Sequence, residues 1–339
     1  MLQRPAGSCA RPAPRSRAAA PLPIERAVAA RPAASASEAP TTACAGAALG
    51  DVSLSVATPH PGPSHRPPSA VTVIEPRPAW SRQDLLELWR YRELLGLLVW
   101  RDIAVRYKQT VMGAAWAIVQ PVATMLIFTL VFGRLARLPS DGVPYPVFVY
   151  AGLLPWLLFS SAVTHASLSL VNQAHLLTKV YFPRLFLPAA GVGVSLVDFI
   201  LSFGVYCGLL AWYGRLPGAG VLAVPPLVVL TAATALGVGL LLASLTVQYR
   251  DVKHVVPFLM QIWLFLSPVV YPVTLVPERW RWLLNLNPLT GLIGAFRSAL
   301  LGLPPDVGAL AAAAAVALGV LALGVWNFRR MERRFADVV

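Results

Sequence analysis

The sequence has few of the residues that build soluble enzymes. Only 13% of its 339 residues are charged, and there are five histidines and three cysteines. Hydrophobic residues make up 57% of the chain, and the mean hydropathy is +0.64. A soluble globular protein rarely carries so much apolar sequence, so the composition indicates an integral membrane protein.

Several motifs are also missing. The cysteine spacings match neither a disulfide framework nor a metal site. A P-loop ends in Gly-Lys followed by Ser or Thr, and none of the three lysines, Lys108, Lys179 and Lys253, follows a glycine. HExxH and GxSxG do not occur either. We therefore predict no metal site, no catalytic residue and no nucleotide-binding motif in this chain.

The formal net charge is +13, but the basic residues do not form one patch. They are spread over the N-terminal segment and the short loops between apolar stretches. This distribution does not favour a nucleic-acid-binding protein.

The first 78 residues differ from the rest of the chain. They hold 14 of the 31 prolines and show neither a helical nor a strand period. We expect this Pro/Ala/Arg-rich segment to be a disordered tail. It is not a secretory signal, because no apolar core follows its basic start.

An amphipathic helix is expected over residues 81–109. Ser81 and Asp84 have the spacing of a capping box. Apolar residues, including Trp89 and Trp100, then recur at helical spacing with arginines between them. This pattern is typical of a helix that lies in the membrane interface. A surface helix packed on a soluble partner has a similar pattern, and the sequence leaves both interpretations open.

Six apolar stretches predict six transmembrane helices in an all-α protein, because about 20 residues at 1.5 Å each span a hydrocarbon core of about 30 Å. The fifth stretch is short and contains Pro257 and Pro268, so we expect a broken helix there. The six stretches cover residues 113–132, 147–167, 185–212, 222–247, 255–271 and 307–326.

The segment Leu289–Leu303 is apolar but only 15 residues long, and Arg297 interrupts it. We expect a re-entrant hairpin before the last span, with its irregular backbone buried in protein. The transmembrane domain would then cover residues 113–327. Residues 328–339 form the expected basic cytoplasmic C-terminal tail.

The distribution of basic residues predicts the topology. With six spans and both termini inside, 14 Lys and Arg from Arg82 onward lie on the cytoplasmic side and six lie outside. A seventh span over Leu289–Leu303 would move four C-terminal arginines outside, against the positive-inside rule.

Two cytoplasmic connectors are candidates for docking a soluble protein. Residues 172–183 are long enough for a short helix, which Pro183 would end, and residues 249–254 form a charged turn. Ordinary basic loops would have the same composition, so the composition alone leaves the docking role open.

Asp198 is the clear acidic residue within the spans. Such a carboxylate is costly in hydrocarbon and is therefore a functional candidate. With no basic partner evident within the spans, we expect a structural hydrogen-bonding role facing another helix. The mid-span aromatic residues could line a path for sugars or simply pack in the core. They are Tyr150, Trp156, Phe159, Phe199, Phe203 and Tyr206.

Five motifs in order resemble the permease subunit of type 2 ABC exporters that move lipid-linked polysaccharides. The resemblance covers about residues 81–330, and none of it reaches the first 78 residues. Leu185 departs from the pattern, since the family often has an acidic residue after Phe-Pro-Arg. The motifs are RYKQTVMGAAWAIVQP (106–121), YFPRLFLP (181–188), QYRDV (248–252), SPVVYPVTLVPERWRWLLNLNP (267–288) and NPLTGLIGAFRSALLG (287–302).

The resemblance implies a homodimer in the bacterial inner membrane that pairs with two separate ABC ATPase subunits. ATP and magnesium would bind to those partners, and this chain would hold no cofactor. The substrate would be a lipid-linked polysaccharide of the O-antigen, capsule or teichoic acid type, handled among membrane lipids.

The resemblance also implies roles for particular residues. The connector and the charged turn would receive the ATPase motion through Asn172, His175, Lys179, Tyr181, Arg184, Arg250 and Asp251. The N-terminal helix would lie beside the lipid entrance and offer Arg101, Arg106 and Lys108 to a pyrophosphate. The mid-span aromatics and Asp198 would line a channel, and Thr274–Leu301 would close its outer side.

Three alternatives have different signatures. An ABC-2 permease for a small molecule or drug would have a closed apolar cavity instead of a wide aromatic path. A membrane glycosyltransferase or acyltransferase would need exposed acids and histidines, which are scarce near either surface. A proton-coupled carrier would depend on Asp198 and need no ATPase.

Overall fold

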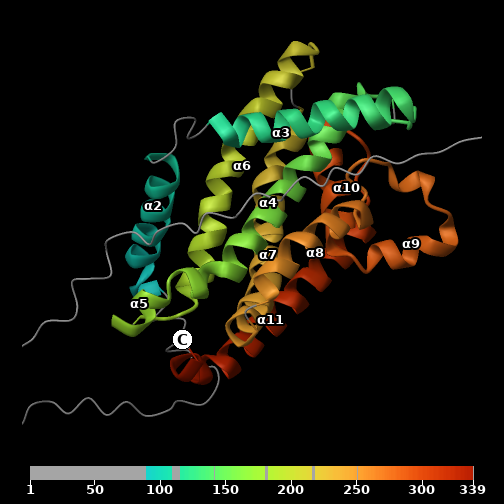
Figure 1. Ribbon diagram of the computed structural model, residues 1–339. Helices are drawn as coiled ribbons and strands as arrows, with labels where there is room; N and C mark the ends of the chain where they lie inside the picture. The colour runs from blue at the N-terminus through green and yellow to red at the C-terminus, as the bar shows by residue number, and fades with distance from the viewer. Residues whose placement is uncertain are drawn as a thin grey trace, which may run out of the picture. The chain divides into compact units, whose positions relative to one another are not determined.

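A computed structural model describes residues 89–108, 115–140, 142–179, 182–215, 218–249 and 251–338, all within the unit Ile74–Val339. Every regular element in these ranges is a helix (Figure 1). The expected tail over residues 1–78 and the capping box at Ser81 and Asp84 lie outside the described residues.

The helices in these ranges vary from single turns to spans of more than 25 residues. In chain order they are α2 (Arg92–Lys108), α3 (Ala115–Phe128) with the π-helical η1 (Thr129–Leu135), α4 (Tyr145–Asn172), α5 (Ala174–Lys179), α6 (Phe186–Trp212), the 3-10 helix η2 (Ala219–Ala223), α7 (Val224–Gln248), α8 (Val252–Leu266), the 3-10 helix η3 (Val273–Leu275), α9 (Glu278–Asn285), α10 (Pro288–Leu301) and α11 (Val307–Val338).

Five helical segments are long and apolar enough to cross a membrane, and they match five of the six predicted spans. They are Ala115–Leu135, Tyr145–Asn172, Phe186–Trp212, Gly220–Gln248 and Val307–Glu332. The predicted span over 255–271 is shorter than expected, because α8 has only 15 residues and ends at Leu266. Pro257 lies inside α8, whereas Pro268 lies in the turn that follows it.

Local sequence explains where several helices begin and end. Proline occupies the first turn of α4, α7 and α10, where its missing N–H costs no intrahelical hydrogen bond. The Asn287 side chain accepts a hydrogen bond from the Leu289 N–H and so caps α10. Gly302 ends α10 at φ +73°, a conformation that glycine adopts without strain.

Helix α4 is the centre of the bundle. It packs extensively against both α6 and α7. In its most apolar stretch 78% of the residues are buried, compared with 11% in the α3–η1 segment. Figure 1 shows α4 between α6 and α7, with α3 running across α6 rather than along it. Most of the apolar surface of α3 is therefore left for contacts outside this chain.

The apolar interior forms two clusters. The larger one joins α4, α6, α7, α8 and α10, with Phe148, Phe159 and Phe296 among its fully buried rings. The smaller one joins α2, α6, α7 and α11 and includes Leu98, Phe186 and Phe328. The predicted basic C-terminal segment over 328–339 is helical as far as Val338, because α11 continues through it, and Phe328 is completely buried.

The turn after α8 is held from inside the protein. Arg297 on α10 is buried; its Nη2 donates to the Val269 carbonyl at 2.7 Å, and its guanidinium lies 3.8 Å from the centre of the Phe148 ring. Gly152 leaves room for it, since a Cβ there would lie 2.8 Å from Arg297 Nη2. Tyr145 donates a hydrogen bond to the Val270 carbonyl at 2.9 Å. Arg297, expected in an outside segment, is thus a structural anchor inside the protein.

Helices α7 and α11 approach each other through glycine. A Cβ on Gly324 would collide with the Gly237 carbonyl oxygen, and a Cβ on Gly237 would lie 2.7 Å from Leu321 Cα. Small residues allow such close backbone contact between membrane helices, where dispersion forces supply much of the association energy.

We predict that Gly324→Ala lowers the free energy of unfolding by about 1–3 kcal/mol, because the added methyl group overpacks the α7–α11 contact. Gly319→Ala on the same helix is the matched control, since a Cβ there meets nothing within 4 Å. Thermal unfolding in detergent should separate the two variants. Equal midpoints would show that this contact is not tight.

Candidate functional site

A polar cavity of about 370 Å³ lies among α2, α3, α4, α6 and α8. This size suits a small-molecule ligand. Besides the Tyr107 phenol, its lining side chains include five Ser or Thr hydroxyl groups and a histidine, together with one cation, one carboxylate and one amide. They are Ser160, Ser161, Thr164, Ser195, Ser202, His165, Arg106, Asp198 and Gln120.

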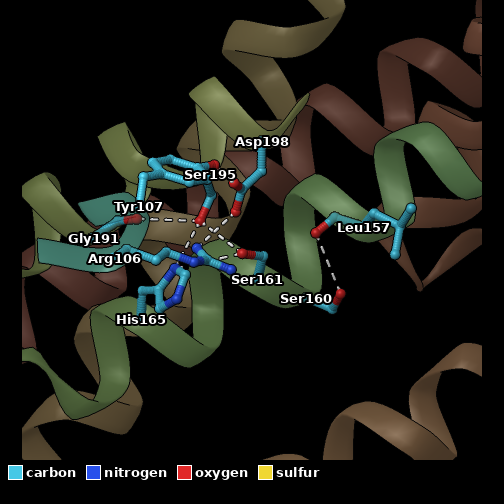
Figure 2. A network of polar contacts seen from close by, with 9 residues as sticks. All are labelled: Arg106, Tyr107, Leu157, Ser160, Ser161, His165, Gly191, Ser195 and Asp198. Atoms are coloured by element: carbon cyan, nitrogen blue, oxygen red, sulfur yellow. Dashed lines mark hydrogen bonds and ion pairs between the residues drawn. The ribbon is translucent and has the colours of Figure 1, made fainter. Parts of the chain in front are cut away.

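An ion pair joins α2 to α6 at this cavity. Arg106 Nη1 lies 2.8 Å from Asp198 Oδ2, and the Tyr107 hydroxyl donates to Asp198 Oδ1 at 2.6 Å (Figure 2). Asp198 therefore does have a basic partner, although not one from within the membrane spans, where none was expected. Its partner comes from the N-terminal helix, 92 residues away in the chain.

The pair lies near the middle of α6. Helix α6 has 27 residues and is therefore about 40 Å long, and Asp198 lies about 18 Å from its first residue. A hydrocarbon core is about 30 Å thick, so Asp198 lies well inside the length of the span. An uncompensated carboxylate there would be strongly destabilised, which explains why a cation and a phenol both contact it.

Tyr107 acts as a hydrogen-bond donor. Burial, followed by the hydrogen bond to the Asp198 carboxylate and its negative charge, raises the pKa of Tyr107 to about 12. The phenol is therefore protonated at neutral pH and donates a hydrogen bond to the Asp198 carboxylate.

Ser161, His165 and Ser195 form a second polar group in the same cavity. Ser195 Oγ lies 3.0 Å from Ser161 Oγ and 3.1 Å from His165 Nδ1, and it donates to the Gly191 carbonyl at 3.2 Å (Figure 2). Gly191 lets α4 and α6 approach closely here, since a Cβ would lie 2.9 Å from the His165 carbonyl carbon.

Two aromatic residues complete the cavity. Trp116 on α3 is 56% exposed and lines its edge together with the exposed Gln120, so the cavity opens along α3. Phe199 lines it from α6 and stacks on Phe203 with ring centres 5.9 Å apart.

The cavity has balanced charge. Arg106 supplies the one cationic side chain of its lining and Asp198 the one carboxylate. No group of three or more His, Cys, Asp or Glu side chains suited to a metal ion occurs in the described ranges. The arrangement can therefore bind hydroxyl groups and apolar faces without favouring a charged ligand.

The predicted channel residues separate into two groups. Tyr150, Phe159 and Tyr206 have no exposed surface, and the two tyrosine rings stack with centres 5.9 Å apart. In this structure these three side chains belong to the core of the chain rather than to the wall of the cavity. Trp156 is also nearly buried, at 5% exposure. Of the predicted set, Asp198 and Phe199 line the cavity.

The predicted lipid-contacting cations are not equivalent. Arg101 Nη2 lies 2.7 Å from Asp102 Oδ1, and Arg106 is paired with Asp198. Lys108 is exposed at the C-terminal end of α2.

The predicted coupling residues lie at the far end of α4. Asn172 ends α4, and α5 follows at Ala174–Lys179, before Pro183 as expected; His175 on α5 is exposed. Gln173 Nε2 donates to Asp102 Oδ2 at 3.2 Å, so this end also contacts α2.

Other coupling residues fall outside this description or have structural contacts. Arg184 Nη1 donates to the Glu332 carbonyl of α11 at 2.7 Å, and Asp251 directly precedes α8. Tyr181 and Arg250 lie outside the described residues, and of Lys179 only the backbone is described.

Sequence reasoning missed the Ser161–His165–Ser195 group. Its signal was present: Ser161 and His165 are four residues apart, as are neighbours on one helix face, and Ser195 and Asp198 are three apart. Two polar helix faces in apolar spans indicate that they face each other or a cavity, rather than lipid.

The profile of the ABC-2 type transporter family matches residues 93–301. The O-antigen export system permease protein RfbA of Myxococcus xanthus is 34% identical over 257 residues, covering 75% of this chain and 98% of the relative. A protein of the same name from Klebsiella pneumoniae is 25% identical, covering 73% and 95%. The polysialic acid transport protein KpsM of Escherichia coli is 26% identical, covering 59% and 78%.

We predict that Arg106→Gln destabilises the protein, because it leaves the mostly buried Asp198 carboxylate without its cation. Asp198→Asn should destabilise it less, because the Arg106 side chain is 45% exposed. The double variant should recover part of the loss, with a coupling energy of about 0.5–3 kcal/mol. Thermal unfolding in detergent measures all three variants.

The exposed pair Arg281–Glu278, separated by 3.5 Å, is the matched control. Its coupling should stay below about 1 kcal/mol. If the two pairs showed the same small coupling, the Arg106–Asp198 pair would contribute little to the fold.

Proposed function

Because the chain belongs to the ABC-2 type transporter family, we propose that it is the membrane-spanning permease subunit of an exporter for a lipid-linked polysaccharide of the O-antigen or capsule type. The observation that carries this proposal is the match to two O-antigen export permeases over at least 95% of their lengths. The more distant match to a polysialic acid transport protein also concerns a polysaccharide. The family consists of transport subunits, which disfavours the transferase alternative.

A separate ATPase supplies the energy in this proposal. The sequence has no P-loop lysine, so two ATPase subunits would bind ATP and magnesium. They would act on the α4–α5 end of a permease dimer, where α4 ends at Asn172, Gln173 donates a hydrogen bond to Asp102, and α5 follows with His175 and Lys179.

The proposed topology has six spans in the bacterial inner membrane. Helix α8 would be the sixth crossing element, although its 15 residues extend only about 22 Å. The turn after it would lie at the outer side, and the short helices α9 and α10 would form the re-entrant pair. The excess of Lys and Arg on one side supports cytoplasmic termini.

A second copy of the chain would cover part of the exposed apolar surface. Val255, Phe258, Ile262 and Phe265 are exposed along α8 at helical spacing, and α3 is mostly exposed as well. These faces would meet lipid or the other protomer around the glycan path.

Helix α2 would lie beside the lipid carrier. Leu97 and Trp100 on α2 are exposed, as is Trp89 just before the helix, and these side chains suit contact with lipid. The exposed Lys108 is the cation of α2 best placed to meet an anionic head group, because Arg101 and Arg106 already contact carboxylates.

Affinity purification of the chain from native membranes in mild detergent tests this proposal. We expect a P-loop ATPase to copurify in equal amount, and deletion of the gene should cause a lipid-linked glycan to accumulate inside the cell. A surviving complex without an ATPase, or a deletion strain with normal surface glycan, would contradict the function.

We further predict that Lys179→Glu combined with Arg184→Glu abolishes export while the chain still inserts, because two positive charges at the ATPase contact are reversed. Arg215→Glu, at an exposed residue after α6, is a charge-reversal control away from this contact and should export normally. Surface glycan is measured by immunoblot alongside protein level, since Arg184 also bonds to α11. Normal glycan in the double variant would refute the coupling role.

A further inference from the structure

The cavity beside α2 lies within one chain, among α2, α3, α4, α6 and α8. Its volume of about 370 Å³ is in the range of small-molecule sites. The side chains that line it indicate whether a phosphate or a sugar of a lipid-linked glycan would bind there.

Charge argues against a phosphate as the occupant. A phosphate site needs an excess of positive charge, whereas Arg106, the cation of this lining, is held 2.8 Å from Asp198. A phosphate bound to Arg106 would lie close to that carboxylate and be repelled by it. The balanced charge favours an uncharged ligand.

The remaining groups fit a sugar. Asp198 and Gln120 can accept hydrogen bonds from hydroxyl groups, and Ser161, His165 and Ser195 can donate or accept them. The Trp116 and Phe199 rings offer apolar faces to the C–H side of a pyranose. Apolar walls with a few convergent polar groups are typical of ligand pockets.

We propose that this cavity binds one uncharged sugar residue of a lipid-linked glycan, with Asp198 as the main hydrogen-bond acceptor. The Arg106 and Tyr107 contacts orient the Asp198 carboxylate, and Trp116 covers the mouth of the cavity. The inference rests on the proposed function, because that function supplies the glycan.

Photolabelling of the purified full-length chain tests the proposal. The protein is extracted in a polyoxyethylene detergent, because an alkyl glycoside detergent would compete for the cavity. Three probes share one alkyl chain with a diazirine next to the head group, which is glucose, a short ethylene glycol chain or phosphate. Labelled peptides are identified by mass spectrometry.

The glucoside should label the cavity peptides of α3 and α4 about tenfold more than the other two probes do. A difference of this size corresponds to one or two additional hydrogen bonds to charged or polar groups. Unlabelled glucoside should compete, and unlabelled alkyl phosphate should not. Equal labelling by the glycol probe would overturn sugar recognition. Stronger labelling by the phosphate would make this an anion site and also overturn the proposal.

Substitutions sharpen the test. Asp198→Asn should reduce glucoside labelling about tenfold and increase phosphate labelling, because Arg106 then lacks its carboxylate partner. If Asp198→Asn does not fold, Ser161→Ala and Trp116→Leu decide the question, and both should reduce glucoside labelling. Ser244→Ala on α7 and Trp326→Leu on α11 are matched controls outside the cavity and should change nothing.

The outcome is independent of the export assay, since the labelling needs neither the ATPase nor transport. If the deletion strain accumulates a glycan but the glucoside does not label the cavity, the proposed function stands and this site is refuted. If the cavity is labelled but no glycan accumulates, the chain has a glycoside site and the export function is wrong.

Discussion

A carboxylate midway along a membrane helix needs a counter-charge in contact, and this requirement determines where the N-terminal helix lies. Leaving Asp198 alone would cost several kcal/mol. Arg106 and Tyr107 on α2 meet it, which holds α2 alongside α6. Two apolar contacts follow from that position: Leu98 enters the smaller core cluster, and Val99 packs at Gly193, where a Cβ would lie 2.6 Å from Val99 Cγ2. The cavity exists because α2 is fixed there.

Unpaired polar groups also determine the packing around the turn after α8. The chain leaves helical geometry after Leu266, so backbone carbonyls lose their helical partners. Arg297 bonds to the Val269 carbonyl, Tyr145 to the Val270 carbonyl, and Asn287 to the Ser267 hydroxyl. These donors come from α4, α10 and the residue before α10. A non-helical segment within an apolar bundle is therefore stable only because the surrounding helices satisfy its polar groups.

The sequence predicts features that depend on a local pattern, such as spans and helix breaks. It does not predict features that depend on contacts between distant residues. Apolar length located five spans, and the prolines indicated a break near the end of α8. The partner of Asp198 lies 92 residues away, and no local pattern identifies it. Aromatic density in the spans does not say which way a ring points, so Tyr150 and Tyr206 resemble channel residues although they stack inside the core. Apolar length alone does not show that α11 continues to Val338, because the residues after Phe328 are rich in charge.

Two polar contacts, each involving a carboxylate, hold α2 against the bundle. One lies at the α4–α5 end and the other lies in the cavity. Asp102 accepts a hydrogen bond from Gln173 beside α5, and Arg106, one helical turn further along α2, contacts Asp198 in the cavity. Because α2 is a continuous helix from Arg92 to Lys108, a displacement of Gln173 that moves Asp102 also moves Arg106. Separating Arg106 from Asp198 would leave the Asp198 carboxylate, whose side chain is only 17% exposed, without its counter-charge. The carboxylate must therefore follow α2 or gain a new hydrogen-bond donor, and hydroxyl groups of a ligand in the cavity could supply one.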